Sequence, residues 1–344
     1  MIRSRAWFRY LLLRSAQAVA VVWAAFTFSF VLLWALPSDP LEVIMGQDAG
    51  VNIDAVKLEE LRHEFGLDRP LLAQYLDGLW QALHGNLGNS IQTGQSVAGM
   101  LSDALPQTAL LGLASTVLAV IGGTVVAVTA VYPRSRLVRQ AILSLPSLGV
   151  SMPTFLIGML LIQIGAFQLK LFPPIGNDGW RSLVLPAITL AVPTGAIIAQ
   201  LLAKSLRTTM LDPYITTAAA KGASKLQIYF SHALRNAAIP TFTMFGMIVG
   251  GIFGGAVVTE TVFARNGIGR VLAEGVTFQD IPVVNGAVVI AAAAFVLCNL
   301  IVDLIVGVLD PRIPTRSHGT ARVKLWCRRL FDRPSPDDHA GITA

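Results

Sequence analysis

The chain has 344 residues, of which 54% are hydrophobic and 13% are charged, and its mean hydropathy is +0.63. Soluble domains carry about 25% charged residues, so this composition excludes a pair of soluble domains and indicates a multi-pass membrane protein. The net charge of +6 is therefore assigned to loops on one side of a membrane and not to nucleic-acid binding. The two cysteines, Cys298 and Cys327, have no neighbours in a metal-ligand pattern.

Residues 1–14 hold four arginines and precede an apolar stretch at residues 15–37. That stretch is too long for the apolar core of a signal peptide, and no small-x-small cleavage site follows it. About 20 residues at 1.5 Å each cross the ~30 Å hydrocarbon layer, so it is predicted to be the first transmembrane helix.

Residues 38–104 form the long polar segment between apolar runs and are predicted to be extracytoplasmic, with short helices. After Pro70, one face of a helical pattern carries six apolar side chains, which are Leu72, Tyr75, Leu76, Leu79, Trp80 and Leu83. An earlier pattern has Leu58, Leu61 and Phe65 at helical spacing. These helices either cover the outer mouth of a bundle or form a solvated loop packed on itself, and the sequence leaves both readings open.

The core, residues 105–311, contains five further apolar runs, at residues 105–132, 138–169, 183–203, 240–263 and 282–309. With six spans and both termini in the cytoplasm, 19 of the lysines and arginines fall inside and 7 outside, which together are the 26 of the chain. Cytoplasmic loops are enriched in these residues. The fold class is therefore an all-α integral membrane protein with six spans. The basic tail, residues 312–344, is predicted to be partly disordered, with residues 323–331 lying on anionic lipid.

Residues 212–239 form a polar insertion between two of these runs and are predicted to contain two short helices. Asp212 can cap the first, Pro213 suits its first position, and Gly222 suits the left-handed residue that ends it. Ser224 and Gln227 form a capping-box pattern for the second helix. A reversal this short predicts a positive φ angle at Gly222.

Two other patterns lie within the apolar runs. Gly246, Gly250 and Gly254 recur every four residues, which favours close helix packing in the bundle or across a subunit interface. The acids Glu260 and Asp303 need partners or water at this depth. Glu260, near the outer end of its helix, could face a pathway. Asp303 is expected to pair with a base, Lys204 or Arg207.

Several phrases resemble the permease subunits of ABC importers, in the dipeptide/oligopeptide/nickel branch. Thr216-Thr217-Ala218 stands where that family has Glu-Ala-Ala, Gly222 matches its glycine, and residues 235–240 match the end of the motif. Residues 65–71, 255–263 and 309–313 also resemble this branch, and the likeness extends from about residue 9 to residue 314. It implies that residues 212–239 dock on an ATPase and transmit its motion. The implied coupling residues are Thr216, Thr217, Ala218, Lys221, Gly222, Ser224, Lys225, Gln227 and Arg235.

The resemblance also implies a place in the prokaryotic inner membrane and a set of partners. These are a second homologous permease, two ATPase domains, an extracytoplasmic substrate-binding protein and membrane lipid. ATP and Mg²⁺ would bind to the ATPase subunits, because this sequence has no phosphate-binding loop of the Gly-x-x-x-x-Gly-Lys type. No metal site or bound cofactor is expected in this chain. Peptides, nickel chelates, glutathione and haem-like cargo are all compatible with the branch.

The competing interpretation is a self-sufficient secondary transporter or channel. Such a protein would be expected to show paired charges at mid-membrane or an inverted repeat, and the sequence contains neither. An intramembrane hydrolase is a more distant alternative, because all five histidines fall outside the apolar runs.

Overall fold

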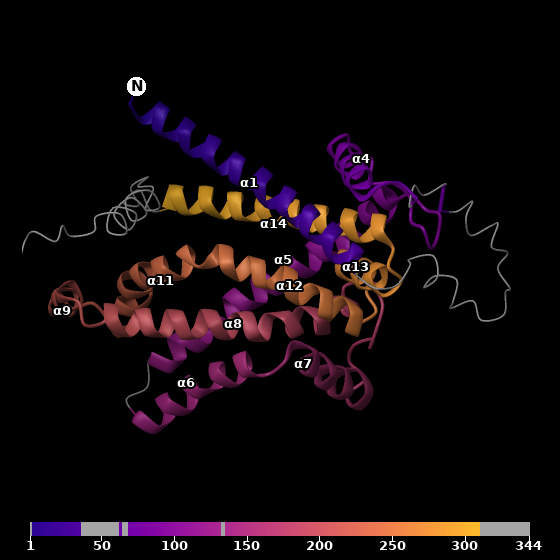
Figure 1. Cartoon of the computed structure of the whole chain (residues 1–344). Coiled ribbons are helices and arrows are strands. Elements are labelled where there is room, and N and C mark those ends of the chain that lie inside the picture. Colours follow the sequence, from indigo (N-terminus) through magenta and orange to yellow (C-terminus); the bar gives the residue numbers. More distant parts are fainter. Residues whose placement is uncertain (1, 36–61, 64–67, 132–134, 310–344) are drawn as a thin grey trace, which may run out of the picture.

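The computed structural model describes residues 2–35, 62–63, 68–131 and 135–309, and these residues are almost entirely helical (Figure 1). Five helices are long and apolar enough to cross a membrane. They are α1 (Ile2–Trp34), α5 (Val97–Val131), α8 (Arg181–Thr209), α12 (Phe245–Val262) and α14 (Ile281–Leu309). A sixth span is present if the bent pair of α6 (Arg136–Ser151) with α7 (Thr154–Leu161) and its π-helical extension η1 (Ile162–Gln168) counts as one.

The run predicted as one span over residues 138–169 is a bent pair of helices, and it supplies the sixth span only if both halves are counted together. Its two halves meet at 103°. Met152 has φ −81° and ψ 129°, an extended conformation, because the ring of Pro153 disfavours the helical region for the residue before it. As a result α6 packs against α5 and α8, whereas α7 packs against α8 and α12.

The centre of the bundle is the crossing of α5 and α8 (Figure 1). The two backbones meet at glycines: a β-carbon added at Gly123 would lie 2.6 Å from the carbonyl oxygen of Gly195. A β-carbon at Gly195 would lie 3.1 Å from the carbonyl oxygen of Ala119. The sequence analysis did not single out this pair. The other long helices surround it, and α1 packs at the edge of the bundle along α14.

Short helices lie at both ends of the bundle (Figure 1). One end, called here the α9 end, holds α9 (Pro213–Ala220), α10 (Lys225–Gln227), the π-helix η2 (Ile228–Ala233) and α11 (Leu234–Thr243). The other, the α4 end, holds α4 (Leu71–Leu83) and α13 (Ile268–Thr277). Helix α5 begins at Val97 and not at residue 105, because Val97, Leu101 and Ala104 are buried in one cluster with Ile268 of α13.

Parts of two predictions lie outside the described residues. One is the helical pattern of Leu58, Leu61 and Phe65, and the other is the tail from residue 312, including residues 323–331. The sequence-based expectations for them remain predictions.

Candidate functional site

The turn at the α9 end has the conformation that the sequence predicts. Gly222 has φ +84°, which confirms the positive angle. The N–H of Gly222 donates to the carbonyl oxygen of Ala219 at 3.0 Å, and that of Ala223 to Ala218 at 3.2 Å, which is the Schellman pattern of a helix C-terminus. Among the described residues, no atom lies within 4 Å of a β-carbon added at Gly222. The backbone, and not packing within the chain, therefore requires glycine here.

The caps of these helices agree only in part with the sequence analysis. Pro213 occupies the first turn of α9, but the Asp212 side chain makes no capping hydrogen bond. The N–H of Gln227 donates to Ser224 Oγ at 3.3 Å, which supplies one half of the capping box. Beyond it the helix continues through η2 and α11, past Pro240, and α12 begins only at Phe245.

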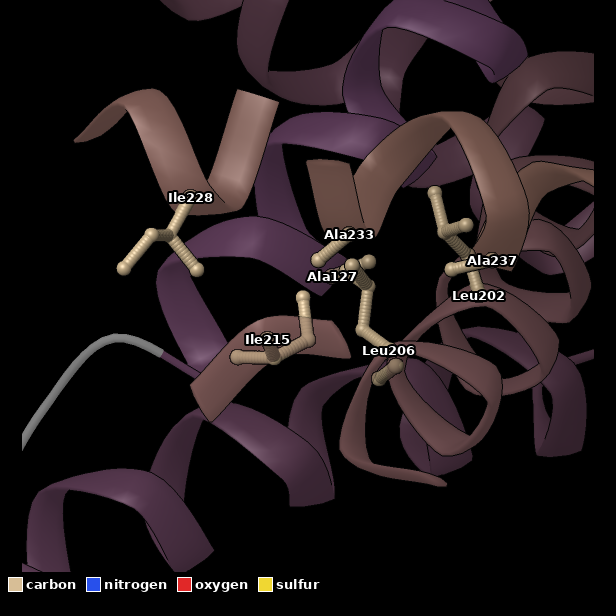
Figure 2. Close-up of a cluster of buried hydrophobic side chains, with 8 residues drawn as sticks. Ala127, Leu202, Leu206, Ile215, Ile228, Ala233 and Ala237 are labelled. Carbon is tan, nitrogen blue, oxygen red and sulfur yellow. The ribbon is translucent and has the colours of Figure 1, made fainter. Parts of the chain in front are cut away.

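An apolar cluster fixes residues 212–239 to the ends of α5 and α8 (Figure 2). Each of its eight members is buried, and they are Ala127, Leu202, Ala203, Leu206, Ile215, Ile228, Ala233 and Ala237. Hydrogen bonds add to it: Tyr229 Oη donates to the carbonyl oxygen of Val131 at 3.3 Å. Asn236 Nδ2 donates to Tyr214 Oη at 2.8 Å. The segment is therefore packed onto two spanning helices and is not a loose connector.

The opposite surface of this segment carries most of the predicted coupling residues. The exposed ones are Thr216, Thr217, Lys221, Gly222, Ser224, Gln227 and Arg235, and Ala218 is half-buried. The side chain of Lys225 lies outside the described residues. Three large apolar side chains, Leu211, Leu226 and Phe230, are exposed beside them, and the sequence analysis did not identify these. Exposed apolar side chains within a polar segment indicate an interaction surface.

A groove of about 570 Å³ runs between α7, α8 and α12. Thr194, Gln200 and Lys204 of α8 line one wall, and Met247 and Gly251 of α12 line the other. Gln200 and Lys204, four residues apart, share one face of α8, and Thr194 lines the same groove. Polar side chains on a membrane-length helix normally face a protein interior or water and not lipid, so this groove is the candidate pathway surface of the chain.

Glu260 does not face this groove, and the expectation that it could face a pathway is wrong for this structure. Its side chain is 1% exposed. Thr108 Oγ1 donates to Glu260 Oε1 at 2.7 Å, and the N–H groups of Gly269 and Arg270 donate to Oε2 at 2.8 and 3.3 Å. The carboxylate accepts from the first turn of α13, where a negative charge is stabilising. A β-carbon at Gly269 would lie 2.5 Å from Val257 Cα, so glycine permits this approach.

Arg265 is the cation closest in sequence to Glu260 and is 2% exposed. Its Nη1 donates to the carbonyl oxygen of Ser182 at 3.2 Å, and its Nη2 donates to Gln107 Oε1 at 3.1 Å. Pro186 has no N–H and leaves that carbonyl without its helical partner. Burial lowers the pKa of the Arg265 guanidinium, and the charge of Glu260 opposes the shift. The need of a buried acid for a base could have identified Arg265 from the sequence.

The three spaced glycines of α12 differ in their surroundings. A β-carbon at Gly246 would collide with Asn299 Oδ1, and one at Gly250 would lie 2.6 Å from a ring carbon of Phe295. Both residues therefore lie close to α14. Gly254 has no atom within 4 Å of such a β-carbon among the described residues, so its role in packing stays a prediction.

The side chain of Asp303 lies outside the described residues, so its pairing with Lys204 or Arg207 also stays a prediction. In the part of the chain that the structure describes, no three His, Cys, Asp or Glu side chains gather to hold a metal ion.

Comparison with known proteins decides the family. Residues 104–314 match the family described as binding-protein-dependent transport system inner membrane component, and residues 7–112 match its N-terminal family. The chain belongs to this family. As a member of it, the protein is a permease subunit of the bacterial inner membrane.

Individual relatives of this permease agree with the assignment. A probable peptide ABC transporter permease of Sinorhizobium fredii is 36% identical over 88% of this chain and 98% of its own length. The glutathione transport system permease GsiC of Escherichia coli K12 is 33% identical over the same shares. A solved structure of the inward-facing MetNI methionine ABC transporter matches 61% of this chain and 96% of its own, with TM-score 0.52 and 18% identity. The last match supports the fold alone.

Proposed function

We propose that this permease imports peptides or a related small solute and forms half of the translocation pathway together with a second, homologous permease. The cargo class rests on the two relatives, whose names specify a peptide and glutathione. The groove between α7, α8 and α12 supplies this chain's side of the pathway. Its mixture of apolar walls with Thr194, Gln200 and Lys204 suits a solute that has both apolar and polar groups.

Residues 212–239 connect this permease to separate ATPase subunits, which bind ATP and Mg²⁺. The main observation in support of this connection is that the segment is packed on the bundle on one side and exposed on the other. Its buried cluster joins the ends of α5 and α8, and its outer surface presents Leu226 and Phe230 beside the predicted coupling residues. A rigid connection of this kind transmits a displacement at the surface to the helices that line the groove.

The charge bias places the α9 end in the cytoplasm, where ATPase subunits reside, and the α4 end outside, where a substrate-binding protein would deliver cargo. In this arrangement the chain hydrolyses no ATP by itself. ATPase activity of the purified chain, free of other subunits, would contradict the proposal.

Substitutions at Gly222 test the connection. Gly222→Val places a β-branched residue at φ +84°, a conformation that costs L-residues about 1–2 kcal/mol and branched ones more. Gly222→Asn is the matched control, because asparagine adopts the left-handed conformation readily. We expect normal membrane levels for both variants and loss of substrate uptake for Gly222→Val.

The control separates two physical causes. If the turn needs only its backbone conformation, Gly222→Asn retains uptake. If the ATPase packs directly on the turn, both variants lose uptake and co-purify less ATPase, because both place a β-carbon in the contact. Normal uptake by Gly222→Val would refute the connection, since residues 212–239 would then be a passive link.

A further inference from the structure

One face of α4 is apolar and exposed. Leu72, Leu76, Trp80 and Leu83 follow helical spacing, and their side chains are between 52% and 73% exposed. These four residues are called here the α4 apolar stripe. Such a stripe normally packs against the protein core, but here it points away from the bundle.

The polar side of α4 borders a cavity of the protein. Gln74, Asp77 and Gln81 line a cavity of about 450 Å³, together with residues of α1 and α14. Arg69 closes part of this surface, because its Nη1 donates to Asp77 Oδ2 at 3.0 Å and its backbone oxygen accepts from Gln74 Nε2 at 2.8 Å. The side chains of Arg69 and Asp77 stay 60% and 55% exposed, so α4 exposes a polar side and an apolar side, as an amphipathic helix at a membrane surface does.

The contact with α1 fixes this orientation. The Tyr75 ring packs against Phe26 and Phe30 of α1, at centroid distances of 5.7 and 5.5 Å. Tyr75 Oη shares a hydrogen bond of 2.8 Å with Thr27 Oγ1. The apolar stripe cannot turn inward without losing these contacts.

The part of α1 that α4 contacts belongs to its membrane-length stretch, residues Arg14–Trp34. Other sides of the same turns are apolar and exposed, at Phe28, Val31 and Leu32. A spanning helix at the edge of a bundle exposes such residues to lipid. Helix α4 therefore packs on the last turns of a span that is exposed to lipid, close to where that span ends. Its tryptophan is of the type enriched where a membrane meets water.

We propose that α4 is an interfacial helix whose apolar stripe is immersed in the phospholipid acyl chains at the α4 end of the bundle. The polar side of α4 then lies between the acyl chains and the cavity that Gln74, Asp77 and Gln81 line. The helix anchors the segment that follows α1 at the membrane surface, as amphipathic interfacial helices do.

The test measures which environment surrounds each face of α4. Cys298 and Cys327 are first replaced by alanine. A nitroxide label is then attached to a single cysteine at Leu76→Cys, Trp80→Cys or Gln81→Cys. The full chain, with the subunits that co-purify with it, is reconstituted in vesicles of phosphatidylethanolamine and phosphatidylglycerol. Collision of each label with oxygen, which concentrates in lipid, is compared with collision with a water-soluble nickel chelate.

We expect the ratio of oxygen to nickel collisions to be several-fold higher at Leu76→Cys and Trp80→Cys than at Gln81→Cys, the matched control on the polar side. If Trp80→Cys fails to assemble, Leu72→Cys reports on the same face. Equally low ratios on both faces would place α4 in water, and equally high ratios would show that its polar side is also in lipid. Either result overturns the proposal. Protection of the stripe positions from both reagents would show that protein covers them, which also overturns it.

Discussion

Replacing Gly123 by alanine perturbs the crossing of α5 and α8 at its closest point. The added β-carbon would lie 2.6 Å from the carbonyl oxygen of Gly195 and 2.9 Å from two carbons of Ile198. Real β-carbons essentially never approach another heavy atom within 3.0 Å, so the helices must separate by at least the difference, 0.4 Å. Neither neighbour can rotate away, because one is backbone and the other is a stiff β-branched side chain.

The magnitude follows from two opposing effects. Overpacking of a close-packed interior costs about 1–3 kcal/mol, whereas alanine stabilises a helix by about 0.5–1 kcal/mol relative to glycine. We therefore expect Gly123→Ala to lower the free energy of unfolding by about 0.5–2 kcal/mol.

Gly122→Ala is the matched control, because no atom of the part of the chain that the structure describes lies within 4 Å of a β-carbon at that position. It is expected to leave stability unchanged or to raise it slightly. Gly195→Ala is expected to fall between the two, since its β-carbon would lie 3.1 Å from the nearest atom. The measurement is the thermal midpoint of each purified variant in detergent, read as the fraction that stays monodisperse after heating. Equal midpoints for Gly122→Ala and Gly123→Ala would refute the argument.

Three further substitutions test single interactions. Glu260→Ala leaves the buried N–H of Gly269 and the half-buried N–H of Arg270 without their acceptor. It is expected to cost about 2 kcal/mol or more, seen as a lower thermal midpoint with unchanged cargo preference; altered preference at full stability would contradict this. Asp280→Ala removes the acceptor of Ser90 Oγ at 2.6 Å and of the Val283 N–H at the start of α14. Proteolysis at residues 86–96 should therefore become faster, and an unchanged cleavage rate would show that Asp280 does not hold this segment. Asp303→Asn is expected to lower the thermal midpoint. The double variant Asp303→Lys with Lys204→Asp should restore it if these two side chains pair. No restoration would leave Arg207 as the partner to test.

The family comparison and the helical fold agree with what local sequence features predict. Apolar runs of membrane length specify spanning helices because a helix satisfies all its backbone hydrogen bonds within one segment, whatever the neighbours are. The positive φ angle of Gly222 could also be predicted, because a short reversal between two helices favours a residue without a β-carbon. Both inferences depend only on residues adjacent in the chain.

The tertiary structure decided what depends on distant residues. Pro146, Pro186 and Pro193 lie inside helices, whereas the chain bends at Pro153, and the proline rule alone does not separate these cases. At Pro186 the freed carbonyl of Ser182 accepts from Arg265, which is 83 residues away.

The same reason applies to Glu260 and to the α4 apolar stripe. An acid near a helix end can face a pathway or a neighbouring helix, and only the position of Thr108 and of the first turn of α13 shows which. An apolar helical face normally predicts a contact with the core. In α4 one member of that face, Tyr75, packs on α1, whereas Leu72, Leu76, Trp80 and Leu83 stay exposed. Burial is set by the neighbours that the fold supplies and not by the pattern itself.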